Sequence, residues 1–288
     1  MIVNVTRRHL LAGGAGLGLG AAMAMPRGSA SASASLDLAN PRTRADVYAK
    51  IYATTDAAEV HKYWTVHYYA YLHDGGNMVP LYSMLNYNYS RWRPAGDGRY
   101  RGTAYEVGVY TDFDGDTILD ETWINPVTGE EQPIAHFKGG PWPEEIGPDG
   151  IAQLSGGPDR LDEMVIRVIG DTVWLPTAAN YNFAIPGTDD GTGKPRKSYW
   201  DSYFNYGAPL ADVLDPDLPS VPFLGALHNL SDWYPGMGMT GRAGRVFGRA
   251  PGQKLNSVDE VPALAKLGFD RHTPEIFDVD NWQPPRFG

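Results

Sequence analysis

The first half of the sequence carries histidine, glutamate and tyrosine side chains at positions where they could transfer protons. His67 lies in KYWTVHYYAYL, Glu106 in YEVGVY and His136 in IAHF, each among apolar or aromatic residues. Burial and neighbouring charges shift the pKa values of such groups into the range in which general acids and bases work at neutral pH. Singly, each is more often a satisfied polar group of a core or surface. Together they predict a catalytic set with phenolic donors: His136, Glu106, Tyr110, His67 and Tyr105.

Aromatic side chains near these residues predict a binding surface. The sequence holds eight tryptophans and seventeen tyrosines, enough to line a cavity, and aromatic rings stack on flat apolar molecules. We therefore expect the ligand to be a small aromatic or otherwise apolar molecule. The residues predicted to contact it are Trp123, Tyr87, Trp142, Asn125 and Tyr69.

An aspartate-rich stretch, YTDFDGDTILDETW, raises the question of a calcium site. A calcium loop of the EF-hand type needs Gly at its sixth position and Glu at its twelfth. Counted from Asp112, these positions hold Thr117 and Trp123. A hairpin turn at Asp114-Gly115 is therefore the preferred interpretation, and a weak surface calcium site remains the alternative.

Two glycine-rich stretches resemble nucleotide-binding motifs without meeting their requirements. Gly236-x-Gly238-x-x-Gly241 follows WYP rather than a parallel strand, and a dinucleotide fingerprint needs such a strand before it. The stretch GTGKP lacks the upstream glycine and the hydroxyl of a P-loop. The chain has no cysteine, which excludes disulfides and thiolate chemistry. We predict no cofactor and no metal.

The candidate residues lie on segments that alternate with the period of strands. In Tyr63–Leu72, one face carries Trp64, Val66 and Tyr68, and the other carries tyrosines and His67. Asn40-Pro41 is typical of a helix start, which predicts a helix to about Ala53. The next expected strands, separated by turn residues, are Leu81–Trp92, Thr103–Thr111, Ile118–Asn125 and Gln132–Lys138.

The rest of the chain has a weaker pattern. Residues 139–160 are rich in Pro and Gly and predict a long surface loop. Later expected elements are a hairpin of Met164–Gly170 with Thr172–Ala178, a strand at Ser198–Tyr206, and, in a less regular tail, a short helix at Val258–Lys266. The fold class predicted is mainly β: an antiparallel meander closing into a lipocalin-like or calycin-like barrel, with an N-terminal helix and long loops.

The N-terminus has the features of an export signal. TRRHLL precedes a short Gly/Ala-rich apolar run, as in twin-arginine signal peptides. We expect residues 1–35 to be a signal peptide and spacer, and residues 36–288 to be a single domain that is periplasmic or secreted. The formal net charge is −10, and an acidic surface repels nucleic acid and anionic lipid. Neither nucleic-acid binding nor membrane insertion is expected, and the oligomeric state stays open.

The order of motifs resembles a known family. The segments KYWTVHYYAYL, YEVGVYTD, ILDETWINPVTGEEQPIAHF, DWYPGMGM and GQKLNSVDEVP are similar to those of the exported bacterial proteins catalogued as domain of unknown function 1838. The resemblance runs over most of residues 40–280. It implies export and a shared fold, and it implies no particular reaction.

Three functions are compatible with these residues. The first is a cofactor-free lyase, dehydratase or isomerase that uses general acid/base catalysis on a small aromatic molecule, such as a lignin-type phenolic, or another apolar molecule. The second is a non-catalytic, lipocalin-like binding protein for a hydrophobic small molecule. The third is a metal-dependent hydrolase that uses His67, His136 and a carboxylate, because ligands on neighbouring strands leave no linear motif.

Overall fold

The structure is a computed structural model. It describes residues 36–73, 78–153, 160–162, 164–184, 191–195, 197–234, 237–239 and 241–283. Residues Leu36–Gly288 form one compact unit, distinct from Met1–Ser35. The expected signal peptide therefore lies outside the described residues. No helix in the described ranges is long and apolar enough to cross a bilayer.

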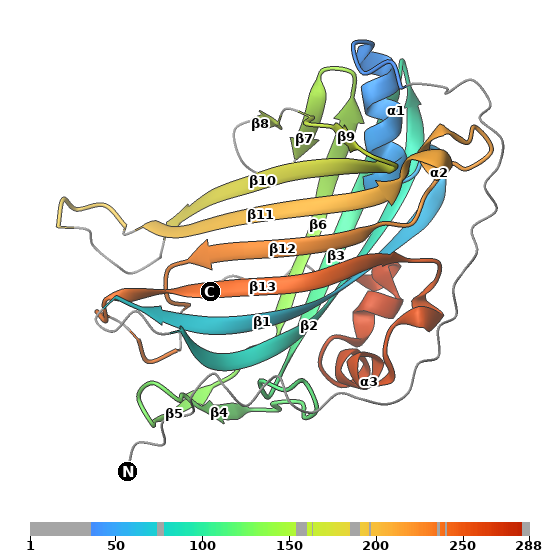
Figure 1. Ribbon diagram of the computed structural model, residues 1–288. Coiled ribbons are helices and arrows are strands. Elements are labelled where there is room, and N and C mark those ends of the chain that lie inside the picture. Colours follow the sequence, from blue (N-terminus) through green and yellow to red (C-terminus); the bar gives the residue numbers. More distant parts are fainter. Residues whose placement is uncertain are drawn as a thin grey trace, which may run out of the picture. The chain divides into compact units, whose positions relative to one another are not determined.

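Strands dominate the described chain (Figure 1). The α-helices are α1 (Pro41–Tyr52), α2 (Leu210–Leu214) and α3 (Ala263–His272), and the 3-10 helices are η1 (Val258–Glu260), η2 (Pro274–Phe277) and η3 (Val279–Asn281). The strands are β1 (Ala58–Leu72), β2 (Met78–Gly96), β3 (Arg99–Thr111), β4 (Thr122–Ile124), β5 (Glu131–Pro133), β6 (Phe137–Gly147), β7 (Gly150–Gln153), β8 (Arg160–Asp162), β9 (Arg167–Ile169), β10 (Thr172–Ala184), β11 (Lys197–Pro209), β12 (Leu224–Ser231) and β13 (Gly244–Leu255).

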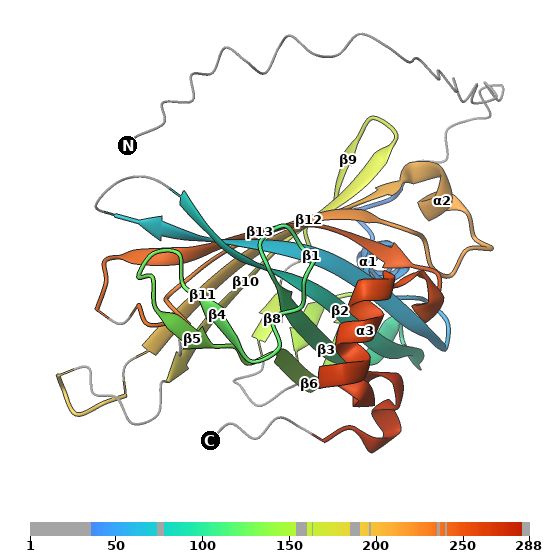
Figure 2. The same cartoon turned by 90° about the horizontal axis from the view of Figure 1, so that it is seen from below.

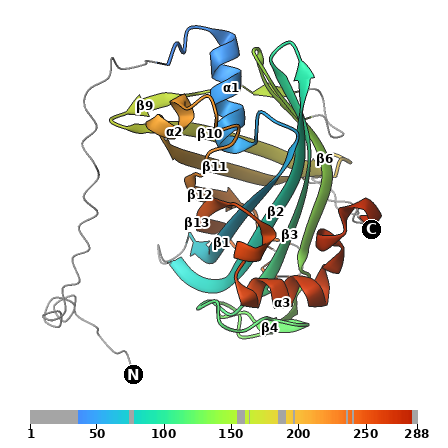
Figure 3. The ribbon, with the colours of Figure 1, turned by 90° about the vertical axis from the view of Figure 1, so that its right-hand side faces the viewer.

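Eleven of the described strands form one antiparallel sheet in the order β8-β7-β6-β3-β2-β1-β13-β12-β11-β10-β9. The sheet curls strongly (Figure 3), which agrees with the right-handed twist of antiparallel strands. The expected mainly-β antiparallel fold with an N-terminal helix is confirmed. The sheet is a half-barrel rather than a closed ring, because its two edge strands, β8 and β9, do not pair with each other in the described chain. Helix α1 contacts strands of both halves of this sheet, β6 and β11.

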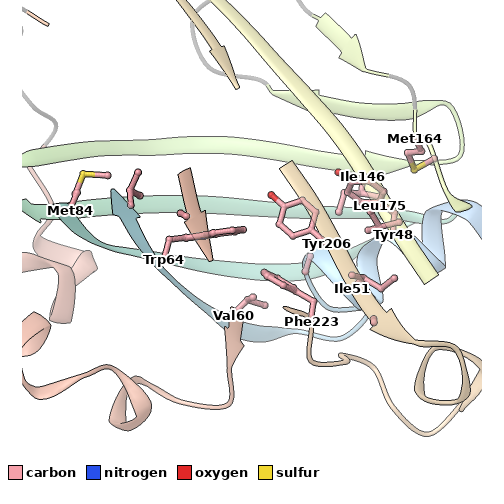
Figure 4. Close-up of a cluster of buried hydrophobic side chains, with 14 of the residues drawn as sticks. Tyr48, Ile51, Val60, Trp64, Met84, Ile146, Met164, Leu175, Tyr206 and Phe223 are labelled. Atoms are coloured by element: carbon pink, nitrogen blue, oxygen red, sulfur yellow. The ribbon is translucent and has the colours of Figure 1, made fainter. Parts of the chain in front are cut away.

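The N-terminal helix fills one end of the inner face of the sheet. The Asn40 side chain accepts a hydrogen bond from a main-chain amide of the first turn at 2.9 Å, and Pro41 occupies the first helical position. The predicted helix start is confirmed. Tyr48 and Ile51 are buried against strand residues such as Tyr206 (Figure 4). We call this side, which also carries Trp64, the concave face.

The opposite, convex face is covered in part by α3 (Figure 2). Phe269 of α3 is fully buried, and its ring stacks on that of Tyr87 in β2 at a centroid distance of 5.9 Å. A Cβ on Gly268 would lie 2.8 Å from Val109, so a glycine here allows the helix to approach β3 closely. The alternation predicted for β1 is confirmed, since Trp64 and Tyr63 belong to hydrophobic clusters on opposite faces.

Two sequence predictions about the second half of the chain are wrong. Residues 139–160 were expected to form a loop, but β6 continues to Gly147, and β7 pairs with it. The tail after residue 209 contains two long strands, β12 and β13. Glycines hid these strands from the residue pattern. Gly225 and Gly252 are glycines because a Cβ would lie 2.8 and 2.0 Å from the Trp64 ring.

Three predicted elements are displaced or shortened. The strands expected at Ile118–Asn125 and Gln132–Lys138 shrink to β4 and β5, a separate two-stranded ribbon. His136 consequently lies between β5 and β6 rather than on a strand. The helix expected at Val258–Lys266 begins only at Ala263, because Pro262 precedes the first helical residue and a 3-10 turn comes before it.

The aspartate-rich stretch forms the expected turn. The Asp112 carboxylate accepts hydrogen bonds from the amides of Gly115, Asp116 and Thr117 at 2.9, 2.8 and 3.2 Å. Gly115 has a positive φ of 86°, which favours glycine in a tight turn. The amide bonds hold the pKa of Asp112 below its usual value despite some burial.

We expect Asp112→Ala to lower the free energy of unfolding by about 1–2 kcal/mol, as for the loss of a side chain that caps main-chain amides. Asp114→Ala and Asp116→Ala are the matched controls, because both side chains are exposed in the same turn, and each should change stability by less than about 0.5 kcal/mol. Urea unfolding followed by circular dichroism measures all three. If chelator lowers the stability of the wild type but not of these variants, the turn binds metal and the interpretation is wrong.

Candidate functional site

A row of polar side chains crosses the concave face from strand to strand. The row runs through four neighbouring strands. Lys254 of β13 lies opposite Lys62 of β1, and Lys62 in turn lies opposite Asn88 of β2. Asn88 then lies opposite Glu106 of β3. Directly opposed residues of antiparallel strands project to the same side of a sheet. Trp64, two residues from Lys62, packs on the concave face, so the whole row lies there.

Lys62 is a buried amine without an ion-pair partner in the described chain. The residue is 3% exposed, and its Nζ lies 3.4 Å from the centroid of the Tyr52 ring. Burial lowers the pKa of Lys62 to about 8, against the opposing attraction of Glu144 and Glu106. The cation is thus stabilised by a ring face and by nearby carboxylates rather than by direct hydrogen bonds.

Two carboxyls near Lys62 are perturbed in the opposite direction. Burial raises the pKa of Glu106 to about 6, although a 2.8 Å hydrogen bond from Asn86 and the charge of Lys62 oppose the rise. Burial also raises the pKa of Glu144, which accepts a hydrogen bond from the Tyr52 hydroxyl at 3.2 Å. Groups whose pKa values move toward each other in this way are candidates for proton transfer.

Aromatic rings surround the polar row. A Cβ on Gly139 would lie 2.3 Å from the Trp142 ring, so this ring covers Gly139, which is the cross-strand partner of Glu106. Farther along the concave face, Tyr82 makes edge-to-face contacts with Tyr110 and with Trp123, both at 4.9 Å between centroids. Aromatic side chains thus border the polar row on the same face of the sheet.

The structure divides the predicted site residues between the two faces. Glu106, Tyr110, Trp123 and Trp142 lie on the concave side, where Tyr110 and Trp123 both contact Tyr82 and Trp142 covers the glycine opposite Glu106. The convex side holds residues that pack among themselves or under α3: Tyr87, Tyr105, His67 and Tyr69. His67 shares a 2.8 Å hydrogen bond with Ser83. Asn125 is fully buried and donates to the carbonyl of Met237 at 2.7 Å, which is a structural role in the β4–β5 ribbon.

His136 belongs to a different cluster from Glu106. Its Nδ1 accepts a hydrogen bond from the Tyr110 amide at 3.1 Å, and its ring centroid lies 4.0 Å from that of His272. Burial and the neighbouring His272 lower the pKa of His136 to about 4. No contact joins His136 to Glu106 in the described structure, so the predicted pairing across the interior is not formed.

The geometry likewise separates the histidines of the metal-hydrolase alternative. His67 and His136 have different neighbours, Ser83 for the first and His272 for the second. Within the part of the chain that the structure describes, no group of three His, Asp or Glu side chains is arranged to hold a metal ion. This arrangement gives that alternative no support.

Three residues of the site do not appear in the sequence prediction: Lys62, Tyr52 and Glu144. Lys62 left a signal, because its even-numbered position places it on the same strand face as Trp64 and Val66, where a charge is unexpected. Tyr52 lies on a helix, and Glu144 lies in the segment predicted to be a loop. Nothing in the residue pattern connects these two to Lys62.

The raised pKa of Glu106 predicts a pH-dependent stability. A carboxyl with a higher pKa in the folded chain than in the unfolded chain stabilises the fold at low pH, and the contribution is lost as the pH rises through the folded pKa. Relative to Glu106→Gln, we expect the wild type to lose about 1–2 kcal/mol of unfolding free energy between about pH 4 and about pH 7.5. Urea unfolding of both proteins at the two pH values measures this; a constant difference would show that Glu106 has an ordinary pKa.

The comparisons with known proteins identify the family. No curated protein matches the chain closely enough to be a recognised relative. A family model described as "Protein of unknown function (DUF1838)" matches residues 57–282. This segment runs from the start of β1 to the end of the helices that follow β13, and it includes the concave face with Lys62, Glu106 and Trp142. The chain therefore belongs to the DUF1838 family of proteins of unknown function.

Proposed function

We propose that the concave face is the active site of a cofactor-free lyase, dehydratase or isomerase. Its substrate is a small aromatic molecule, such as a lignin-type phenolic, or another apolar molecule. The observation that carries this proposal is the placement of partly buried Glu106 opposite the glycine that the Trp142 ring covers and in one cross-strand row with buried Lys62, with both pKa values displaced toward neutrality.

The two groups have complementary roles near neutral pH. With a pKa of about 6, Glu106 is mostly a carboxylate and accepts a proton from the substrate. With a pKa of about 8, Lys62 is mostly an ammonium and donates one. A general acid or base whose pKa lies near the working pH is the most effective. Tyr110, on the same face as Glu106, is a phenolic hydrogen-bond donor for an oxygen of the substrate.

Two buried polar atoms support a second candidate function, which is ligand binding without turnover. Asn229 Oδ1 and Ser231 Oγ are buried on the concave side of β12 and have no hydrogen-bond partner in the described structure. Polar groups of this kind are costly unless they are satisfied, and a ligand with a hydroxyl group would satisfy them. A lipocalin-like binding protein would need these atoms and the aromatic rings, but it would not need Glu106 as a base.

The arginine pair and the apolar run that follows it support the proposal that the protein acts outside the cytoplasm. A twin-arginine signal would export the folded chain to the periplasm or the medium. The charge of −10 makes nucleic acid an unsuitable partner.

A turnover screen distinguishes the two candidates. Purified protein is incubated with lignin-type phenolics and terpenoids, with and without chelator, and the products are identified by mass spectrometry. Isomerised, dehydrated or cleaved products of unchanged oxidation state, formed equally with chelator, support the enzyme. Saturable binding of the same compounds with no product supports the binding protein and contradicts the proposed catalysis.

Ligand binding should depend on Trp142. Loss of a stacked ring costs on the order of 1 kcal/mol of binding free energy, in addition to the contribution of the apolar area that the ring buries. Trp142→Ala should therefore weaken binding by about five-fold or more. Trp174→Ala is the matched control, because the Trp174 ring also covers a glycine, Gly207. Trp174 lies on the convex face, since the next residue of β10, Leu175, packs on the concave face. Quenching of tryptophan fluorescence by a phenol measures both affinities. Equal affinities in the two variants would place the ligand away from Trp142.

A further inference from the structure

We infer that Lys62 binds carbonyl compounds covalently, with its Nζ forming an imine with an aldehyde or ketone held on the concave face. This inference rests on the proposed function, because it assigns a substrate class to the same site. It goes beyond acid/base catalysis in making Lys62 a nucleophile. The different geometries of Lys62 and of its cross-strand neighbour Lys254 carry the argument.

Lys254, the cross-strand neighbour of Lys62, is a half-buried lysine whose amine is held by hydrogen bonds. Its Nζ donates to the carbonyls of Lys50 and Ala53 at 3.0 and 2.8 Å and to Ser220 Oγ at 3.0 Å. All three ammonium protons have acceptors, and two of these acceptors belong to the C-terminal end of α1. An amine bound in this way has no free lone pair and stabilises the helix end.

Lys62 has none of these acceptors. Its Nζ faces the Tyr52 ring at 3.4 Å, and no ion pair with a described carboxylate holds it. Burial lowers the pKa of both Lys254 and Lys62, so the direction of the pKa shift does not distinguish the two lysines. The two lysines differ in geometry. The Lys254 amine is hydrogen-bonded, whereas the Lys62 amine has no hydrogen bond in the described structure. Lys62 also lies on a face that carries aromatic rings and the carboxyls of Glu106 and Glu144.

The same position supplies a reactive form of the amine. With a pKa of about 8, roughly a tenth of Lys62 is neutral at pH 7, which is roughly 300-fold more than for an exposed lysine. Desolvation of an amine in an apolar pocket is a recognised way to produce a nucleophilic lysine. The nearby glutamates then serve to move protons rather than to hold the ammonium in an ion pair.

The reaction balances without an oxidant or reductant. The Nζ lone pair forms a bond to the carbonyl carbon, and the C=O π electrons move to the oxygen, which takes up a proton to give a carbinolamine. That hydroxyl takes a proton from an acid and leaves as water while the nitrogen lone pair forms the C=N bond, which gives the protonated imine with one proton still on nitrogen; loss of that proton gives the neutral imine. Protonated Glu106 is suited to donate to the departing oxygen. The protonated imine would lie over the Tyr52 ring, which stabilises a cation.

An imine on Lys62 would also give Glu106, two strands away, a role as a base. A protonated imine withdraws electrons and acidifies the C–H bonds next to it, so a carboxylate can remove a proton there. Glu106, separated from Lys62 by Asn88 in the cross-strand row, is the candidate for that step. Elimination and isomerisation next to a carbonyl are the reactions this pair would support.

Reductive trapping tests the inference on the full chain. The protein is incubated with limiting 4-hydroxybenzaldehyde and sodium cyanoborohydride, which reduces an imine to a stable secondary amine, and the labelled peptide is identified by mass spectrometry. From the larger neutral fraction, we expect Lys62 to be labelled at least about ten-fold faster than the partly exposed Lys266. This measurement needs no variant. Lys62→Arg should abolish the fast label, and Lys266→Arg should leave it unchanged.

A parallel titration separates this inference from the proposed function. 4-Hydroxybenzyl alcohol has the same ring but no carbonyl, and quenching of tryptophan fluorescence reports its binding. Saturable binding of the alcohol with no label at Lys62 overturns the imine and leaves the acid/base proposal standing. Label spread over exposed lysines, without saturable binding of the alcohol, overturns both.

Discussion

Replacing Glu106 by Gln is expected to lower kcat by about 10²- to 10⁴-fold, the usual contribution of a general base. The amide keeps the shape of the carboxyl but cannot accept a proton at neutral pH. The acid limb of the pH–rate profile, which reports ionisation of a group with a pKa of about 6, should disappear with it. The assay uses whichever substrate the turnover screen identifies.

The fold of this variant should survive. Asn86 can donate its 2.8 Å hydrogen bond to the amide oxygen of Gln as it does to Glu106, and no buried negative charge remains to be solvated. Glu145→Gln is the control: this carboxyl follows Glu144 in the same strand but forms surface ion pairs with Arg99 and Arg101, and its loss should leave kcat unchanged. Full turnover and an unchanged pH profile in Glu106→Gln would make Glu106 structural and favour the binding protein.

Trp64→Ala is expected to lower the free energy of unfolding by about 3–5 kcal/mol, as for other buried aromatic side chains cut to alanine. The Trp64 ring lies about 6 Å, centroid to centroid, from three other rings: 6.0 Å from Phe204, 6.0 Å from Tyr206 and 6.1 Å from Phe223. Phe204 and Tyr206 lie on β11 and Phe223 immediately precedes β12, so Trp64 joins β1 to β11 across the concave face. Glycines underlie the ring, and they have no side chain with which to fill the cavity.

Urea unfolding followed by circular dichroism measures this loss, with Tyr203→Ala as control. Tyr203 also lies on β11, but it is 47% exposed, and its removal should cost about 0.5 kcal/mol or less. The same contact can be disturbed from the other side by Gly252→Ala, which places a Cβ 2.0 Å from the Trp64 ring and should cost about 1–3 kcal/mol by overpacking. A loss below about 1 kcal/mol in Trp64→Ala would mean that the concave core can collapse around the cavity.

The sequence by itself determined the fold class, the family and the elements from α1 to β3. The period-two alternation in Tyr63–Leu72 assigned Trp64 and Tyr63 to opposite faces, and Asn40-Pro41 marked the start of α1. These features are local: a cap, a turn or a strand face depends on residues close together in the chain. Glu106 was also proposed in this way, as a carboxyl within an aromatic strand.

Only the tertiary structure decided which side of the sheet is the inside. Alternation shows that two faces exist, but the curl of the sheet and the positions of α1 and α3 placed Glu106 on the concave face and His67 under the convex one. It also decided the partners of Glu106. Lys62 and Glu106 are 44 positions apart in the sequence, yet the strand register places them in one row, two strands apart.

The same reason explains the strands that the residue pattern missed. Gly225 and Gly252 look like turn residues in the sequence, but they are glycines because the Trp64 ring occupies the space of their side chains. That requirement comes from a residue about 160–190 positions earlier, and no local propensity contains it. Long-range packing, rather than the preference of the segment itself, accounts for the glycines of β12 and β13, and these strands extend the face that carries Lys62 and Glu106.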